Sequence, residues 1–154
     1  MSVNFGIIFA TLVASSANAE EMASLDTILA GQPEKSYQYV RCAGFYLANV
    51  EWAGQALDEA AFNDSKSVIS ALLLVATLQR SEKMGGDVEH LAATVNADTR
   101  AVADLYAEDY RQSYATRGTA WDGNPLWESD ASTCKPIGEL ALQMSADLNK
   151  GQTP

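Results

Sequence analysis

The chain is poor in the residues that build metal centres, and it is poor in positive charge. Its 154 residues include one histidine, His90, and two cysteines, Cys42 and Cys134. One histidine cannot form a two- or three-histidine metal centre, and two cysteines cannot hold a zinc finger or an iron–sulfur cluster. Ten basic side chains stand against 20 acidic ones, which gives a formal net charge of -10. This charge argues against nucleic acid and anionic lipid as partners, because both attract basic surfaces.

The first 19 residues contain no charged side chain, and 12 of them are apolar. Phe5 to Ala14 has the length of a signal-peptide h-region, and Ala17-Asn18-Ala19 presents small residues where a signal peptidase cleaves. This apolar run is shorter than the roughly 20 residues that a membrane-spanning helix needs. We therefore expect residues 1–19 to be a signal peptide and residues 20–154 to form a single helical domain. The alternative is an N-terminal helix buried in the fold.

If the protein is exported, its two cysteines lie in an oxidising compartment. Cys42 and Cys134 lie 92 positions apart, and neither belongs to a C-x-x-C pair of the kind that makes a thiol redox-active. In an oxidising compartment, two such thiols are expected to form one disulfide. Closing so long a loop would stabilise the fold by up to about 4–5 kcal/mol, because it restricts the unfolded chain.

The mature chain has the composition of a helical protein. Between residues 20 and 154 there are 21 alanines and 14 leucines, against seven valines and three isoleucines. Ala and Leu favour helices, whereas β-branched residues are enriched in strands. We predict an all-α fold, a compact bundle of four to five helices with one disulfide. The expected helices cover residues 21–30, 36–54, 58–84, 87–116 and 125–148.

Capping residues predict several of these boundaries. Asp87 follows two glycines and is placed to cap the fourth helix, which Gly118 ends. Asn124 followed by Pro125 is a typical helix start, because the asparagine caps and the proline needs no backbone partner at the first position. Pro136 removes a backbone donor from the last helix, so we expect a kink there.

The third expected helix contains an apolar stretch, residues 68–76, with almost no polar face. A helix that is apolar all round is normally the central, buried one. Lys66 and Arg80 bound the stretch, which makes it too short for a membrane span. Cys42 and Cys134 fall within the second and last helices, so their disulfide would join these two.

Tyrosines and tryptophans form the most distinctive candidate binding surface. Tyr106, Tyr110 and Tyr114 recur every four residues, which places three phenols on one helix face. Such a row suits a sugar or a peptide, although it also suits the boundary of a core with hydroxyls reaching solvent. Trp121 and Trp127 lie in and just after a Gly-containing connection, where binding residues are often presented.

Paired carboxylates supply the main catalytic alternative. An envelope hydrolase could use Asp104, Glu108, Asp122 or Glu128, provided that two of them converge and one is desolvated. The spacing of Asp104 and Glu108, between two arginines, favours a solvated ladder of ion pairs over a catalytic pair.

No motif for a cofactor or a metal is present. The chain lacks a phosphate loop, a dinucleotide fingerprint, a nucleophile elbow and an H-E-x-x-H sequence. Asp122-Gly123-Asn124 begins like a calcium loop, but Leu126 and Trp127 stand where that loop needs an oxygen ligand and a glycine. We expect no cofactor.

The sequence around the cysteines carries a resemblance. Residues 41–46 (RCAGFY), residues 114–118 (YATRG) and Asp130, four positions before Cys134, resemble a loose group of small exported bacterial proteins of unknown function. The resemblance implies a signal peptide, a helical fold and a disulfide, and it implies no activity. Residues 42–46 alone are also similar to helical periplasmic immunity proteins that block cell-wall amidases.

These observations favour a protein that works by binding. We expect a periplasmic or secreted adaptor, inhibitor or chaperone-like partner of another envelope protein, because no catalytic motif is present. An acidic surface favours basic partners over anionic ones. The carboxylate hydrolase is the catalytic alternative, and a structural or stress protein whose acidity is itself the function is a third possibility.

Overall fold

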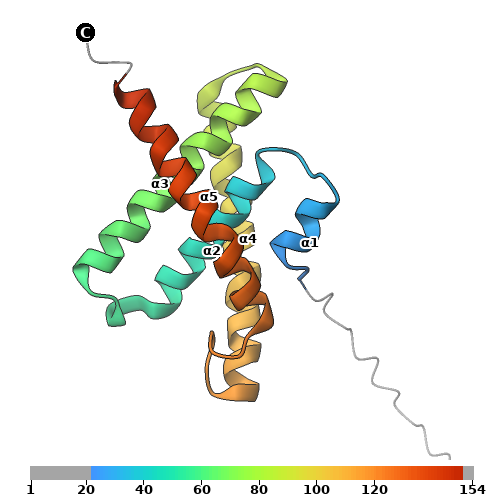
Figure 1. Ribbon diagram of the computed structural model, residues 1–154, viewed down its shortest axis with the longest axis vertical. Helices are drawn as coiled ribbons and strands as arrows, with labels where there is room; N and C mark the ends of the chain where they lie inside the picture. Colours follow the sequence, from blue (N-terminus) through green and yellow to red (C-terminus); the bar gives the residue numbers. More distant parts are fainter. Residues whose placement is uncertain (1–21, 151–154) are drawn as a thin grey trace, which may run out of the picture.

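The computed structural model describes residues 22–150, which form five α-helices and no strands. A short 3-10 turn, η1 (Gly54–Ala56), joins the second helix to the third. The helices are α1 (Leu25–Ala30), α2 (Tyr37–Ala53), α3 (Glu59–Met84), α4 (Val88–Arg117) and α5 (Pro125–Lys150), and they are coloured along the chain in Figure 1. The predicted all-α bundle is confirmed. The predicted signal peptide lies outside the described residues.

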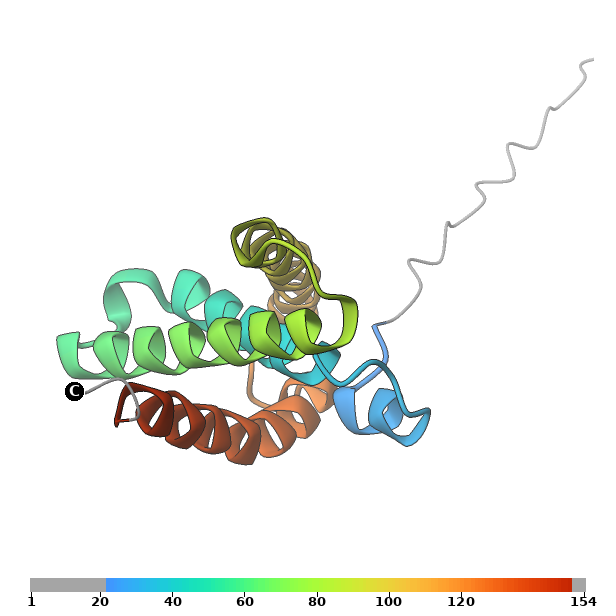
Figure 2. The ribbon, with the colours of Figure 1, turned by 90° about the horizontal axis from the view of Figure 1, so that it is seen from above.

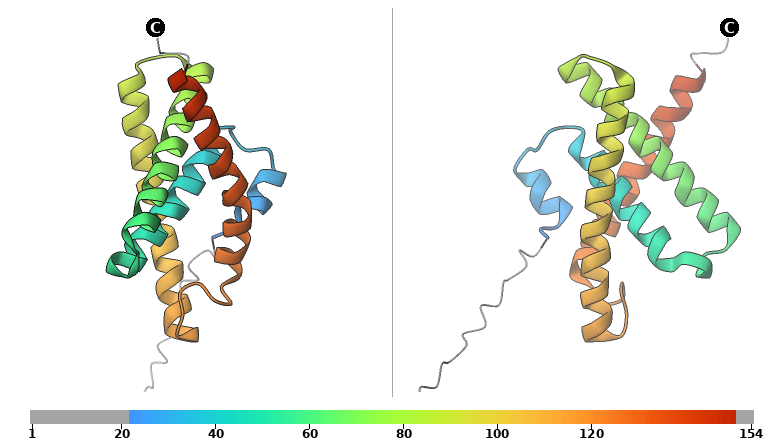
Figure 3. Two further views of the ribbon diagram at one scale, coloured as in Figure 1. Left: turned by 60° about the vertical axis from the view of Figure 1, so that its left-hand side comes forward. Right: turned by 180° about the vertical axis from the view of Figure 1, so that it is seen from behind.

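The four long helices are arranged in three layers. α2 and α3 run antiparallel and form the middle layer, while α4 and α5 cover opposite sides of it (Figure 2). α4 crosses the middle layer steeply, as Figure 3 shows from behind. The short α1 packs against α5 and α2. The backbones of α4 and α5 do not pack against each other, so any link between the outer layers is made by side chains.

Local sequence sets the ends of these helices as predicted. The Asp87 carboxylate accepts a hydrogen bond from the Glu89 amide at 3.0 Å at the start of α4. The Asn124 side chain accepts one from the Leu126 amide at 3.1 Å at the start of α5. Gly118 ends α4 in the left-handed conformation, with φ of 77°, which glycine adopts without steric cost.

Two expected boundaries differ from the structure. α1 begins at Leu25 and not near residue 21, because the backbone groups of Ala23 and Leu25 bond to side chains of α2 and α5. α5 continues through Pro136 as one helix that bows gently in Figure 2. The lost backbone donor therefore curves this helix without ending it.

α2 is the most deeply buried helix, and α3, which shares the middle layer with it, is less buried than the apolar stretch of residues 68–76 predicts. α2 packs against α1, α3, α4 and α5, whereas α3 leaves Leu74 39% exposed and Phe62 40% exposed. Small side chains explain the difference, because they let the neighbouring helices approach α2 closely. The buried apolar face of α2 consists of Tyr39, Val40, Cys42, Ala43, Gly44, Phe45 and Ala48.

Within residues 22–150, one helix is long and apolar enough to cross a membrane by length and composition alone, and it is α3. By this criterion of length and composition, the expectation that the apolar run of α3 is too short to span a membrane does not hold. The core helix of a soluble protein passes the same test, and α3 packs against α2, α4 and α5 in this fold.

Gly44 marks the closest approach between α2 and α4. A Cβ atom added there would lie 2.5 Å from Cγ1 and 2.8 Å from Cβ of Val102. Real Cβ atoms do not come so close to other heavy atoms, so α4 would have to move away. Only glycine permits this helix crossing.

We expect Gly44→Ala to destabilise the protein by about 1–2 kcal/mol, because overpacking outweighs the better helix propensity of alanine. Urea unfolding of the disulfide-intact protein measures the change. In a Val102→Ala background the same substitution should cost less, since one clashing methyl is gone. A Gly44→Ala protein that is more stable than the wild type would contradict the close approach.

Candidate functional site

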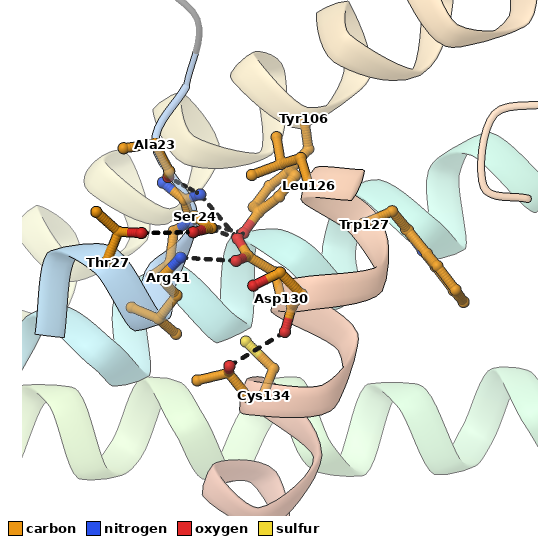
Figure 4. Close-up of polar contacts among 12 residues, drawn as sticks. Ala23, Ser24, Thr27, Arg41, Tyr106, Leu126, Trp127, Asp130 and Cys134 are labelled. Atoms are coloured by element: carbon orange, nitrogen blue, oxygen red, sulfur yellow. Dashed lines mark hydrogen bonds and ion pairs between the residues drawn. The ribbon is translucent and has the colours of Figure 1, made fainter. Parts of the chain in front are cut away.

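Three helices contribute one side chain each to a buried polar network. Arg41 comes from α2, Tyr106 from α4 and Asp130 from α5, and Figure 4 shows them converging. Arg41 Nη2 donates to Asp130 Oδ2 at 2.8 Å, and Arg41 Nε donates to the Tyr106 hydroxyl at 2.6 Å. The Tyr106 hydroxyl in turn donates to Asp130 Oδ2. These side chains link the two outer layers through the middle one.

The segment before α1 completes the network. Asp130 Oδ1 accepts a hydrogen bond from the Leu25 amide at 2.7 Å, and Arg41 Nη2 donates to the Ala23 carbonyl at 2.8 Å. Both charged side chains thereby gain a backbone partner. Buried charges are tolerated only when they are paired and hydrogen-bonded in this way.

Burial dominates the electrostatics of the network. Arg41 is 2% exposed, and Tyr106 and Asp130 are 0% exposed. Desolvation raises the pKa of Tyr106 far above its ordinary value, and the Asp130 carboxylate adds to this while Arg41 opposes it. Burial would lower the pKa of Arg41, but its contacts with Tyr106 and Asp130 raise it overall. The arginine is charged and the phenol is neutral throughout the physiological range.

The disulfide lies directly beside this network. Cys42 follows Arg41 on α2, Cys134 lies one turn beyond Asp130 on α5, and the Cα atoms of the two cysteines are 5.2 Å apart. The predicted bond between the second and last helices is confirmed. A disulfide is consistent with an oxidising compartment outside the cytoplasm.

The three side chains of the network lie below the surface. Arg41, Tyr106 and Asp130 are each at most 2% exposed, so a substrate would reach them only after the helices separate. One signal in the sequence is that Arg41 interrupts the apolar face of α2 between Val40 and Cys42. Its partners come from α4 and α5, and no local pattern identifies them.

The predicted tyrosine row is divided by the fold. Tyr106 and Tyr110 are fully buried, so their place in an exposed binding surface is corrected, while Tyr114 is 58% exposed. The row turns inward because it packs on aromatic rings of α2, with Tyr106 5.4 Å from Phe45 and Tyr110 5.8 Å from Trp52 between ring centroids. Only Tyr114 is available to a partner.

The structure brings Trp121 and Trp127 together at an open hollow of about 120 Å³. Their ring centroids are 6.3 Å apart. Besides these two rings, the wall includes α2, the residue after η1 and the first turns of α3. The lining residues from these elements are Asn49, Val50, Ala53, Leu57 and Ser65. Most of this lining is apolar.

Hydrogen bonds fix one wall of the hollow and leave another group unpaired. Asn49 Oδ1 accepts from Trp127 Nε1 at 2.9 Å and from the Tyr110 hydroxyl at 3.1 Å. Nε1 of Trp121 is buried and has no hydrogen-bond partner among the described residues. Buried N–H groups are nearly always paired, so the unpaired N–H of Trp121 is an exception.

Two larger hollows lie elsewhere on the described surface. One, of about 520 Å³, lies between residues 32–36 and the end of α3, and it is lined mainly by polar side chains. The other, of about 620 Å³, lies between α3 and α5 and is lined partly by Val75, Leu78, Met144 and Leu148. Neither contains a buried side-chain polar atom without a partner, whereas the aromatic hollow does.

None of the four carboxylates of the hydrolase hypothesis is buried. Asp104, Glu108, Asp122 and Glu128 are all exposed, and none lines the aromatic hollow. Asp104 and Glu108 pair with arginines of their own helix, as the ladder interpretation predicts. The geometry that this mechanism requires is therefore missing from these residues. Within residues 22–150 no group of three or more His, Cys, Asp or Glu side chains could hold a metal ion.

Comparisons with protein-family models, with curated proteins and with solved structures give no match for this chain.

We expect Asp130→Asn to destabilise the protein by about 3–5 kcal/mol, because it leaves the Arg41 charge buried without a counter-charge. Urea unfolding at neutral pH measures this loss. Arg41→Met should cost less in the Asp130→Asn background than in the wild type, since the two charges are coupled. If the costs of the two substitutions simply add, the charges of Arg41 and Asp130 are not coupled, and the account of the buried pair is wrong.

Stability should fall as the pH rises above about 10, the ordinary pKa of a tyrosine in the unfolded chain. Burial raises the pKa of Tyr106 and of Tyr110, so both keep their protons in the folded state while the unfolded chain loses them. Each contributes a slope of up to about 1.4 kcal/mol per pH unit. Tyr106→Phe should reduce the slope of unfolding free energy against pH by about this amount, whatever it does to stability at pH 7. An unchanged slope would contradict the burial of this phenol.

Proposed function

We propose that this protein is a non-catalytic binding protein of the bacterial envelope, and that it binds another protein at the hollow between Trp121 and Trp127. The observation that carries the proposal is the pair of indole rings of Trp121 and Trp127 in the wall of an open apolar hollow. A partner's apolar side chain that enters the hollow would remove these rings from water, which stabilises the complex.

The dimensions of the hollow suit one side chain of a partner. About 120 Å³ corresponds to about four water volumes, which is the space of a single leucine-sized group. Aromatic walls are typical of the few residues that dominate binding energy at protein interfaces. The bond from Trp127 to Asn49 holds one wall in place before binding, which lowers the entropy that association costs.

Export from the cytoplasm is the second part of the proposal. The disulfide between Cys42 and Cys134 needs an oxidising compartment to persist, and residues 1–19 have the pattern of a signal peptide. A periplasmic or secreted location places the protein among other envelope proteins, from which its partner would come.

Site-specific crosslinking in the producing bacterium tests the binding site. A photoreactive residue at Gln55, which is exposed on η1 between two lining residues, should give a discrete crosslinked species. The same residue at Gln143, exposed on α5, should not. Ala53→Leu, which fills the hollow, should abolish the product, while Ala60→Leu, at an exposed position outside it, should not. Identical products from both crosslinking positions, or none, would contradict the proposal.

The mass of the purified protein tests export. We expect the mature chain to begin at Glu20, since cleavage after Ala19 follows the small residues that a signal peptidase recognises. Intact-protein mass spectrometry after expression of the full sequence measures this. A protein that keeps residues 1–19 in the producing bacterium would contradict a cleaved signal peptide.

A further inference from the structure

We propose that the aromatic hollow recognises a cationic segment of its partner, in which one apolar side chain is flanked by lysine or arginine. This inference rests on the proposed function, because it names the chemistry of the partner that the same hollow would bind. The observation behind it is the set of carboxylates around the hollow. Each of these carboxylates lies one or two positions in sequence from a residue that lines the hollow. The five are Asp58, Glu59, Asp64, Asp122 and Glu128.

None of these five acids forms an ion pair within residues 22–150. A sixth acid next to a lining residue, Glu51, does pair, with Arg100, and Asp98 pairs with Arg80 away from the hollow. All five side chains are exposed. The region around the hollow therefore carries negative charge that the protein itself leaves uncompensated.

Two of these acids also accept hydrogen bonds from backbone amides, which do not neutralise their charge. The Asp58 carboxylate caps α3 by accepting from the Ala61 amide at 2.8 Å, and Glu128 accepts from the Gly123 amide at 3.2 Å. Backbone amides supply no counter-charge to these carboxylates. Two basic side chains lie next to this group. Lys66 Nζ lies 5.4 Å from the centre of the Phe62 ring, and Arg117 Cδ would lie 4.0 Å from a Cβ atom added at Gly123. Two basic side chains cannot balance five acids.

Charge and the size of the hollow together define the occupant. Residues adjacent in the chain have Cα atoms 3.8 Å apart, so the five acids lie within about one Debye length of the hollow at physiological salt. Lysine or arginine beside the inserted apolar residue would meet these carboxylates. An acidic or nucleic acid partner would be repelled by the same field.

Synthetic peptides with one central leucine test this chemistry. The probes are the acetylated and amidated pentapeptides Lys-Gly-Leu-Gly-Lys, Gln-Gly-Leu-Gly-Gln and Lys-Gly-Ala-Gly-Lys. Each is titrated into the protein produced from the full sequence, and the indole N–H resonances of Trp121 and Trp127 are followed by nuclear magnetic resonance. The lysine peptide should shift the Trp121 resonance and bind roughly fivefold more tightly than the glutamine peptide at low salt. Raising the salt from about 0.01 to about 1 M should remove that difference.

A matched pair of double variants locates the effect. Asp64→Asn with Asp122→Asn neutralises two acids beside the hollow whose side chains make no hydrogen bond within the described chain, so folding should be unaffected. Glu82→Gln with Glu89→Gln removes the same amount of charge at exposed positions elsewhere. The first pair should lose about half or more of the preference for the lysine peptide, and the second should keep it.

The outcomes separate this inference from the function on which it rests. Equal binding of the lysine and glutamine peptides would overturn the cationic preference and leave the apolar hollow as a binding site. Equal binding of the leucine and alanine peptides would show that no side chain enters the hollow, and it would overturn both. A preference for lysine that both double variants weaken equally would also overturn the inference, because net charge alone would then explain it.

Discussion

The buried carboxylate of Asp130 is the point on which the arrangement of the molecule depends. It accepts hydrogen bonds from Arg41 on α2, Tyr106 on α4 and the Leu25 amide at the start of α1, and it belongs to α5 itself. A charge at 0% exposure is stable only while all of these partners stay in place. The network therefore fixes the relative positions of four helices, including two that do not otherwise pack together.

The aromatic hollow lies at the other end of the same interface between α2 and α4. Arg41, Phe45 and Asn49 follow one another every four residues along α2, and they meet Tyr106 and Tyr110 in the same order along α4. Asn49 then holds Trp127 through its side-chain oxygen. A continuous chain of packed and bonded side chains thus connects the sealed network to the open hollow, which makes the hollow a rigid feature of the fold.

Sequence reasoning succeeded where the signal was local. Capping by Asp87 and Asn124, termination at Gly118 and the single disulfide all follow from residues near each other or from the cysteine count. It failed where the outcome depends on long-range packing. The centrality of α2 depends on the close approach at Gly44, and the burial of two tyrosines depends on which face α4 turns toward α2. The unpaired indole of Trp121 has no sequence signature at all.

The hydrogen exchange rate of the Leu25 amide tests the central role of the network most directly. Leu25 is the first residue of the six-residue helix α1, and the first amides of a helix have no partner within the helix and normally exchange quickly. Because it donates to the buried Asp130 carboxylate, it should exchange only when the whole protein unfolds, with a protection free energy equal to that of global unfolding. Exchange at the rate of a frayed terminus would contradict the account.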